Sequence, residues 1–145
     1  MARTTSDIVI DAPADRIMDV IADFASYPVW ATGVKTADIV ATQDGGRAQQ
    51  VHFVLDAAPI RDEYDLGYVW DGDREVSWSL AEPGGMLTSM DGAYLLEPVG
   101  GDQTRVTYQL AVDISVPLLG MLKRKAEKVI IDTALKGLKK QVEAL

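Results

Sequence analysis

The sequence predicts a single α+β domain, in which a curled antiparallel sheet of seven strands surrounds a long C-terminal helix and two short helices follow the first strand. Two observations lead to this prediction. Over residues 34–115, short apolar-alternating runs are separated by turn residues, as in an antiparallel meander. After Pro117, the apolar period changes from two to about 3.6, which indicates an amphipathic helix. The 145 residues suit one domain, 1–145.

The N-terminal elements are predicted from proline positions. Residues 4–11 are rich in Thr, Ile and Val and favour a strand. Pro13 ends that strand and suits the first turn of a helix, where Asp15 meets the positive end of the helix dipole. Ser26–Pro28 is a similar helix-start signal, so we expect a second short helix that ends at Gly33.

Six further strands are predicted where apolar and polar residues alternate. Their ranges are 34–42, 47–56, 60–70, 74–81, 86–97 and 104–115. The breaks between them have the composition of turns. They are Asp44-Gly45-Gly46, Ala58-Pro59, Asp71-Gly72-Asp73, Glu82-Pro83-Gly84-Gly85 and Gly100-Gly101-Asp102.

The C-terminal segment predicts an amphipathic helix of roughly 25 residues. Its apolar stripe comprises Leu118, Leu119, Leu122, Ala126, Val129, Ile130, Thr133, Gly137 and Leu138. Its polar face carries Lys123, Arg124, Lys125, Lys128, Lys136, Lys139 and Lys140.

A cavity follows from the mismatch between the sheet and this helix. One helix about 10–12 Å wide cannot fill the concave face of a strongly curved seven-stranded sheet, so side chains or a ligand must fill the rest. The inward positions are rich in aromatic residues, which serve equally as core or as pocket wall. The predicted ligand contacts are Phe24, Trp30, Phe53, Tyr64, Tyr68, Trp78, Met90, Tyr94, Tyr108, Val129, Ile130 and Thr133.

The charge distribution divides the chain in two. Residues 1–117 carry 7 basic and 19 acidic side chains, net −12, and residues 118–145 carry 7 basic and 3 acidic, net +4. The overall net charge of −8 argues against nucleic-acid binding, which relies on neutralising phosphates. The basic segment is interpreted as a solvated helix face. The alternative is a surface for peripheral contact with an anionic membrane or partner.

Several classes of protein are excluded by composition. No cysteine is present, so disulfides, thiolate nucleophiles and Cys-based metal sites are ruled out. With a single histidine, no metal site and no cofactor are expected, and Asp71–Asp73 is interpreted as a hairpin turn. Neither a signal peptide nor an apolar run of about 18 residues is present, so a cytoplasmic location is expected.

Asp62 is the candidate catalytic residue. It shares the period-two register of Tyr64 and Tyr68, which would direct its carboxylate into an apolar space where desolvation raises the pKa. The alternative is that Asp62 lies at the rim and faces water or pairs with Arg61 or Arg74. The only histidine, His52, alternates with inward positions and is therefore expected on the outer face.

The order of elements and two short motifs resemble the START-like (SRPBCC) superfamily. The motifs are Ile10–Asp15 (IDAPAD), before the first helix, and Tyr27–Trp30 (YPVW), in the second. More narrowly, the chain is similar to the polyketide cyclase/dehydrase and lipid-transport family, which includes coenzyme-Q-binding proteins. This resemblance implies a helix-grip fold with a deep cavity for a lipid, polyketide, quinone or sterol-like ligand, in members that range from carriers to enzymes.

Three functions are compatible with these observations. The first is a carrier or sequestering protein for a hydrophobic small molecule, which fits the shortage of catalytic groups. The second is a polyketide cyclase/aromatase or dehydratase that uses Asp62 and a pocket tyrosine. The third is a module that binds a protein partner. A monomer or weak dimer is expected.

Overall fold

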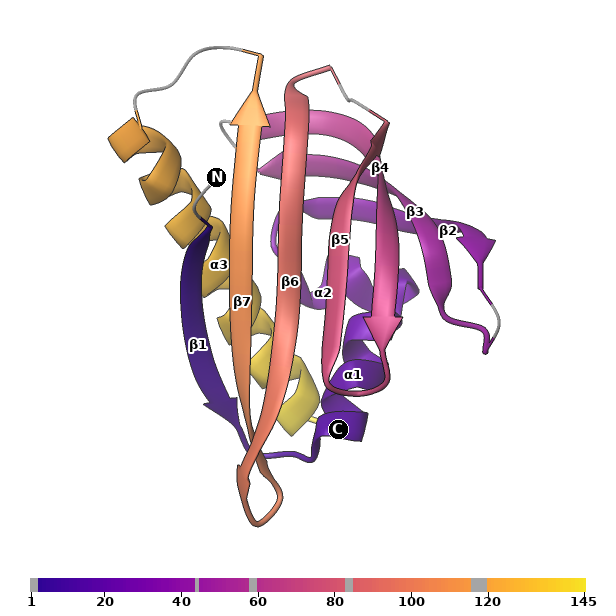
Figure 1. Ribbon diagram of the computed structural model, residues 1–145, viewed down its shortest axis with the longest axis vertical. Coiled ribbons are helices and arrows are strands. Elements are labelled where there is room, and N and C mark those ends of the chain that lie inside the picture. Colours follow the sequence, from indigo (N-terminus) through magenta and orange to yellow (C-terminus); the bar gives the residue numbers. More distant parts are fainter. Residues whose placement is uncertain (1–2, 44, 58–59, 83–84, 116–119) are drawn as a thin grey trace.

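The computed structural model describes residues 3–43, 45–57, 60–82, 85–115 and 120–145 (Figure 1). All the predicted elements are present, and each strand boundary lies within three residues of the prediction. In chain order the elements are β1 (Thr4–Ile10), α1 (Ala14–Ala22), the 3-10 helix η1 (Phe24–Ser26), α2 (Tyr27–Trp30), β2 (Val34–Thr42), β3 (Ala48–Ala57), β4 (Ile60–Asp71), β5 (Glu75–Glu82), β6 (Leu87–Gly100), β7 (Gln103–Ile114) and α3 (Gly120–Glu143).

Some of the residues used in the predictions lie outside the described residues. These are Asp44, Ala58-Pro59, Pro83-Gly84 and the helix-start residues Pro117, Leu118 and Leu119. The side chain of Leu122 also lies outside the described part of the chain.

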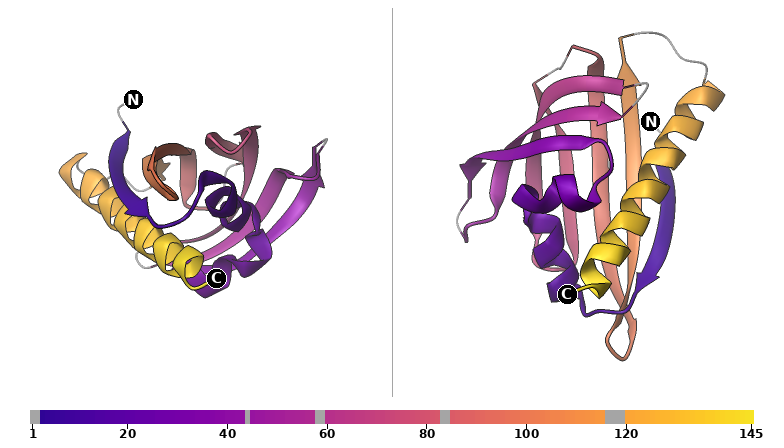
Figure 2. Two further views of the ribbon diagram at one scale, coloured as in Figure 1. Left: turned by 90° about the horizontal axis from the view of Figure 1, so that it is seen from below. Right: turned by 180° about the vertical axis from the view of Figure 1, so that it is seen from behind.

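The strands form one antiparallel sheet in the order β1-β7-β6-β5-β4-β3-β2. The strands from β2 to β7 follow one another as neighbours, and β1 pairs with β7. The register puts alternate residues on the concave face, so Val106, Tyr108 and Leu110 point inward from β7. The sheet curls, and α3 crosses its open side (Figure 2).

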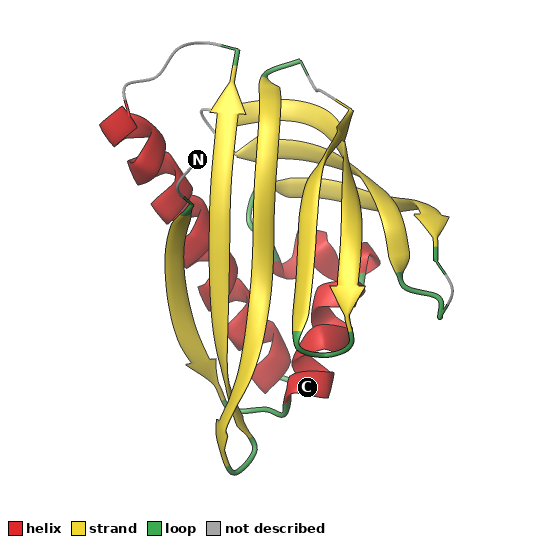
Figure 3. Cartoon of the chain, in the orientation of Figure 1, coloured by secondary structure: helices red, strands yellow, loops and turns green. Residues whose placement is uncertain are grey.

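Helix α3 packs on β1, β7, α1 and α2 through a face that the predicted stripe largely missed. The fully buried residues of this face are Ile131, Leu135, Leu138 and Val142, of which only Leu138 belongs to the stripe. Val129, a stripe residue, is 59% exposed. The helix therefore has two apolar faces, one in the core and one among the residues that line the space inside the sheet. Figure 3 shows this helix in red, running alongside β1.

Glu127 anchors α3 to the sheet. Its side chain is buried and accepts hydrogen bonds from the Thr4 hydroxyl (2.6 Å) and from the backbone N–H of Val112 (2.8 Å). Strand β1 begins at Thr4 opposite Leu110, so the N–H of Val112 lies past the end of β1. The carboxylate of Glu127 provides the acceptor there, because a buried N–H without a partner is costly.

Two glycines permit close approaches that shape the interior. A β-carbon at Gly137 would overlap the carbonyl oxygen of Trp30, so glycine lets α3 touch the end of α2. A β-carbon at Gly92 would overlap the ring of Trp78, its cross-strand partner. The indole of Trp78 therefore lies flat against the floor of the sheet.

Candidate functional site

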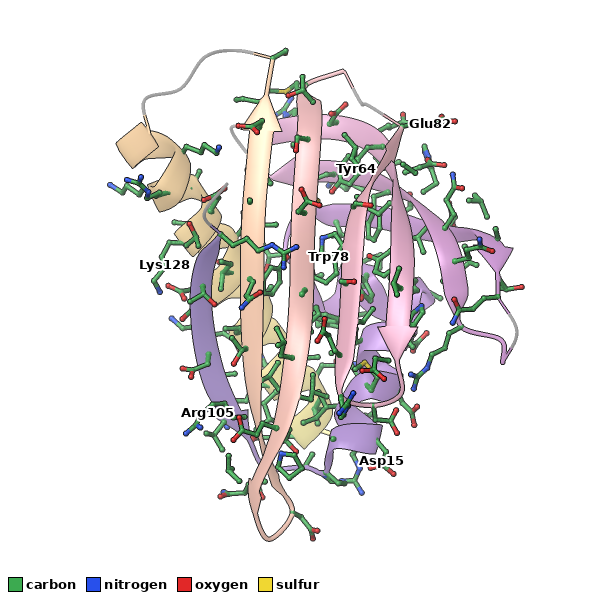
Figure 4. The ribbon with its side chains drawn as sticks, viewed as in Figure 1. Asp15, Tyr64, Trp78, Glu82, Arg105 and Lys128 are labelled. Carbon is green, nitrogen blue, oxygen red and sulfur yellow. The ribbon has the colours of Figure 1, made fainter. Side chains whose placement is uncertain are left out.

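A cavity of about 710 Å³ lies between the concave face of the sheet and α3, with α2 and the loop after it at one end. Tyr64 and Trp78, two of its wall residues, lie within the outline of the curved sheet, whereas Glu82, Arg105 and Lys128 lie at the periphery (Figure 4). The lining residues are Tyr27, Trp30, Ala31, Thr32, Gly33, Val34, Phe53, Leu55, Asp56, Tyr64, Leu66, Tyr68, Trp78, Met90, Tyr94, Tyr108, Leu110, Lys125, Ala126, Val129, Ile130, Thr133 and Ala134.

One wall is a continuous row of rings across four strands. Tyr68 of β4 faces Trp78 of β5 with ring centres 5.9 Å apart, and Trp78 contacts Tyr94 of β6 at 5.4 Å. Tyr94 and Tyr108 of β7 meet edge to face at 4.6 Å. The edge-to-face contact of Tyr94 with Tyr108 has a favourable geometry for an aromatic pair, and the other two pairs are tilted. The row gives the cavity an apolar wall.

A second group of rings closes the end of the cavity near α2. Phe53 and Tyr64 stack at 5.7 Å, and Tyr27 contacts Trp30 at 4.7 Å. Phe24 packs behind this group, with its ring 4.8 Å from that of Tyr27, and is 1% exposed.

Eleven of the twelve predicted ligand contacts therefore line the cavity, and Phe24 does not. Phe24 belongs to the 3-10 helix η1. The sequence alone does not show which way a side chain of such a short helix points. Whether the eleven residues touch a ligand stays a prediction. The predicted contacts omit twelve lining residues. The polar or small loop and helix residues among them, such as Thr32, Gly33 and Lys125, carry no apolar signal, whereas the apolar ones could not be told from ordinary core residues. The twelve are Tyr27, Ala31, Thr32, Gly33, Val34, Leu55, Asp56, Leu66, Leu110, Lys125, Ala126 and Ala134.

The tyrosine hydroxyls divide into two kinds. That of Tyr27 donates to the carbonyl of Ile21 (2.6 Å). Those of three wall tyrosines and of Tyr64 make no hydrogen bond to a protein group within the described part of the chain, although each of these residues is more than 90% buried and lines the cavity. The three wall tyrosines are Tyr68, Tyr94 and Tyr108. Among the described side chains, the fully enclosed polar atom without a partner is Nε1 of Trp30, which also lines the cavity.

These hydroxyls remain neutral hydrogen-bond donors. Burial, and to a smaller extent the neighbouring tyrosines, raises the pKa of Tyr68 and of Tyr94 well above the ordinary value. Burial also raises the pKa of Tyr64 and of Tyr108. A ligand with an acceptor oxygen would satisfy groups that the protein leaves without partners.

Asp62 has the predicted register but a different environment. Its carboxylate accepts hydrogen bonds from the backbone N–H groups of Gly85 (2.7 Å), Met86 (3.0 Å) and Leu87 (2.8 Å), and it does not line the cavity. Burial alone would raise the pKa of Asp62, but the hydrogen bonds from Leu87, Met86, Gly85 and Glu63 outweigh it and lower the pKa. The expected raised pKa was therefore wrong. The alternative position at the rim is correct, because Asp62 lies near the start of β4 and is partly exposed, but Arg61 and Arg74 pair with Asp56 and Asp71 and not with Asp62.

His52 lies on the outer face of β3, as predicted. Its Nδ1 is 2.5 Å from Asp65 and its Nε2 is 3.1 Å from Glu63. Hydrogen bonds to these carboxylates raise the pKa of His52. This cluster is separated from the cavity by the sheet, so it contributes to the surface of the protein and not to the site.

Four lining residues are exposed and mark the mouth of the cavity. They are Thr32, after α2, Asp56, near the end of β3, and Lys125 and Val129 of α3. Asp56 pairs with Arg61 at 2.9 Å. The mouth therefore opens between the first half of α3 and the start of β2.

The described residues include no group of three or more His, Cys, Asp or Glu side chains placed to hold a metal ion. None of the described helices has the length and hydropathy that a membrane span requires.

Similar architectures occur in solved structures. A START superfamily protein from Mycobacterium smegmatis has a TM-score of 0.91 at 21% identity, with 99% of each chain covered. An aromatase/cyclase from a Streptomyces species has a TM-score of 0.80 at 15% identity, with 97% of this chain and 93% of that chain covered. A protein from Thermus thermophilus has a TM-score of 0.79 at 22% identity, with 98% of this chain and 97% of that chain covered. At these identities the similarity concerns the fold.

The fold and the cavity define a protein of the START-like, helix-grip class. Within this class, residues 1–143 match the family described as polyketide cyclase/dehydrase and lipid transport, and the chain belongs to that family. No curated protein matches the sequence significantly.

Proposed function

We propose that this protein binds a hydrophobic small molecule in the cavity between the sheet and α3, as a carrier or sequestering protein. The observation that carries the proposal is the cavity of about 710 Å³ with its row of aromatic rings. Binding pockets for small molecules are concave and mostly apolar, with a few polar groups that orient the ligand. The free hydroxyls of Tyr64, Tyr68, Tyr94 and Tyr108 provide such groups.

Native mass spectrometry of the purified protein, followed by solvent extraction, tests this proposal. We expect a bound lipid, quinone or polyketide-like molecule. The cavity-filling variant Ala126→Phe should lose it, whereas Lys140→Phe, at an exposed position of the same helix, should keep it. Thermal melting of both variants checks that they fold. Failure to find or load any apolar ligand in the wild type would contradict the proposal.

A second candidate function is a cyclase or dehydratase that acts on a polyketide-like substrate. The free tyrosine hydroxyls favour it, because they can donate to a carbonyl whose oxygen gains charge during enolisation. The reaction also needs a base, and the one carboxylate among the described lining residues is Asp56, which is paired with Arg61 at the mouth. For this reason we rank carriage first.

Cyclisation of a synthetic linear poly-β-ketone, followed by chromatography, tests the second candidate. The variants Tyr68→Phe and Tyr94→Phe remove only the hydroxyls, so an enzyme that uses them should lose about 10- to 1000-fold in rate. A wild-type rate equal to that in buffer would exclude this function and leave the carrier proposal unaffected.

A further inference from the structure

The mouth of the cavity has a cation that the helix itself does not neutralise. Lys125 lines the cavity and is exposed. The residues three and four positions away on the helix are Met121, Leu122, Lys128 and Val129, so no carboxylate is adjacent to it on α3. Within the described residues no ion-pair partner for Lys125 is found.

Other lysines of the same helix do have partners. Lys128 pairs with Asp132 at 2.7 Å, and Lys139 pairs with Glu143 at 2.7 Å. Both pairs have the i,i+4 spacing, and Lys125 has no carboxylate at that spacing. The unpaired ammonium group thus lies at the opening of the cavity, in contrast to these two lysines.

The charges around the mouth reinforce this contrast. Asp56 is the one carboxylate among the described lining residues, and it is already engaged by Arg61. Lys125 is therefore the one charged lining side chain without an ion-pair partner among the described residues, in a protein whose net charge is −8. An anion that approaches the acidic molecule would find a favourable potential here.

From this arrangement we infer that the cavity takes an amphiphile with one acidic group, whose apolar body lies against the aromatic wall and whose carboxylate or phosphate meets Lys125 at the mouth. This inference rests on the proposed function, because it concerns the ligand of the same cavity. Val129, one helical turn from Lys125 and 59% exposed, would contact the part of the ligand next to the acidic group. A neutral hydrocarbon would leave the ammonium group of Lys125 without an ion-pair partner.

Two fluorescent probes with the same apolar body test the inference: 1-pyrenebutyrate, which is anionic, and 1-pyrenebutanol, which is neutral. The wild-type protein should bind the acid roughly three- to tenfold more tightly at low salt, and high salt should reduce the preference. Lys125→Gln should bring the two affinities within about twofold of each other, and Lys125→Glu should reverse the preference.

The matched control is Lys140→Gln, which removes the same charge from the same helix about 22 Å away. It should keep the preference for the acid. Equal binding of both probes by the wild type, or an unchanged preference in Lys125→Gln, would overturn the inference while leaving the carrier proposal intact. If neither probe binds the wild type or displaces what copurifies with it, the proposed function itself fails.

Discussion

The two apolar faces of α3 differ in how completely they are packed. On one face Ile131 and Leu135 are buried in the core beside the anchor Glu127. On the other face Ile130 and Thr133 border the cavity and stay partly accessible. One helix can therefore close a fold with one side and leave room for a ligand with the other, because small residues such as Ala126 leave the concave sheet unfilled.

The largest effect is expected when a side chain is shortened on the packed face. Ile131→Ala should lower the free energy of unfolding by about 2–5 kcal/mol, because it creates a void in a dense core. Ile130→Ala should cost clearly less, because it only enlarges an existing cavity, but it should change the binding of a pyrene probe. Urea denaturation measures both costs. Equal losses would show that the two faces are packed alike.

The next effect concerns the anchor on the packed face. Glu127→Ala should cost about 1–3 kcal/mol, because the Thr4 hydroxyl and the Val112 N–H lose their acceptor in a buried position. Amide hydrogen exchange near the start of β1 should accelerate. Thr133→Val, a similar loss of polarity on the cavity face, should leave stability within about 0.5 kcal/mol.

Asp62, near the start of the interior strand β4, extends the comparison to the rim of the sheet. Asp62→Ala should cost about 1–2 kcal/mol, because four backbone N–H groups lose a charged acceptor. The pKa of Asp62 is lowered in the folded protein, so its contribution is present above the ordinary carboxyl pKa of about 3.9 and is lost as the pH falls through the lower folded value. Acid unfolding of the wild type and Asp62→Asn should therefore converge at low pH, and parallel curves would contradict this role.

The smallest effect is expected on the outer face of the sheet. The pKa of His52 is raised in the folded protein, so its contribution is full below the ordinary histidine pKa of about 6.5 and disappears as the pH rises through the higher folded value. His52→Gln should remove this pH dependence at a cost of a few tenths of a kcal/mol, because the pair is exposed. An NMR titration of the ring gives the pKa directly, and a value at or below about 6.5 would contradict the assignment.

The sheet was predictable because alternation is a local property. From Val51 to Leu55 and from Tyr64 to Trp70 every second residue is apolar, so the inward positions of Phe53, Tyr64 and Tyr68 follow from the sequence alone. The packed face of α3 was not predictable in the same way. Apolar residues occur around much of its circumference, and only the position of β1 and β7 decides which of them are buried.

The roles of the two structural carboxylates could not be predicted, because their partners are distant in the chain. Asp62 was assigned the correct face, but the N–H groups that hold it come from residues 85–87. Glu127 resembles any charged residue of an exposed helix face, and its burial depends on where β1 begins. Lys125 was counted only as part of a basic face. Its place at the mouth depends on the neighbouring ends of α2 and β3.

The anchoring of α3 has a consequence for the kinetics of ligand exchange. Glu127 joins the helix to β1 and β7, and the close contact of Gly137 with Trp30 joins it to α2 ten residues further on. We expect a helix held at two points about 15 Å apart to act as a fixed wall of the cavity during ligand exchange. We therefore expect the residence time of a ligand to be set at the Thr32 side of the mouth, by the short loop before β2.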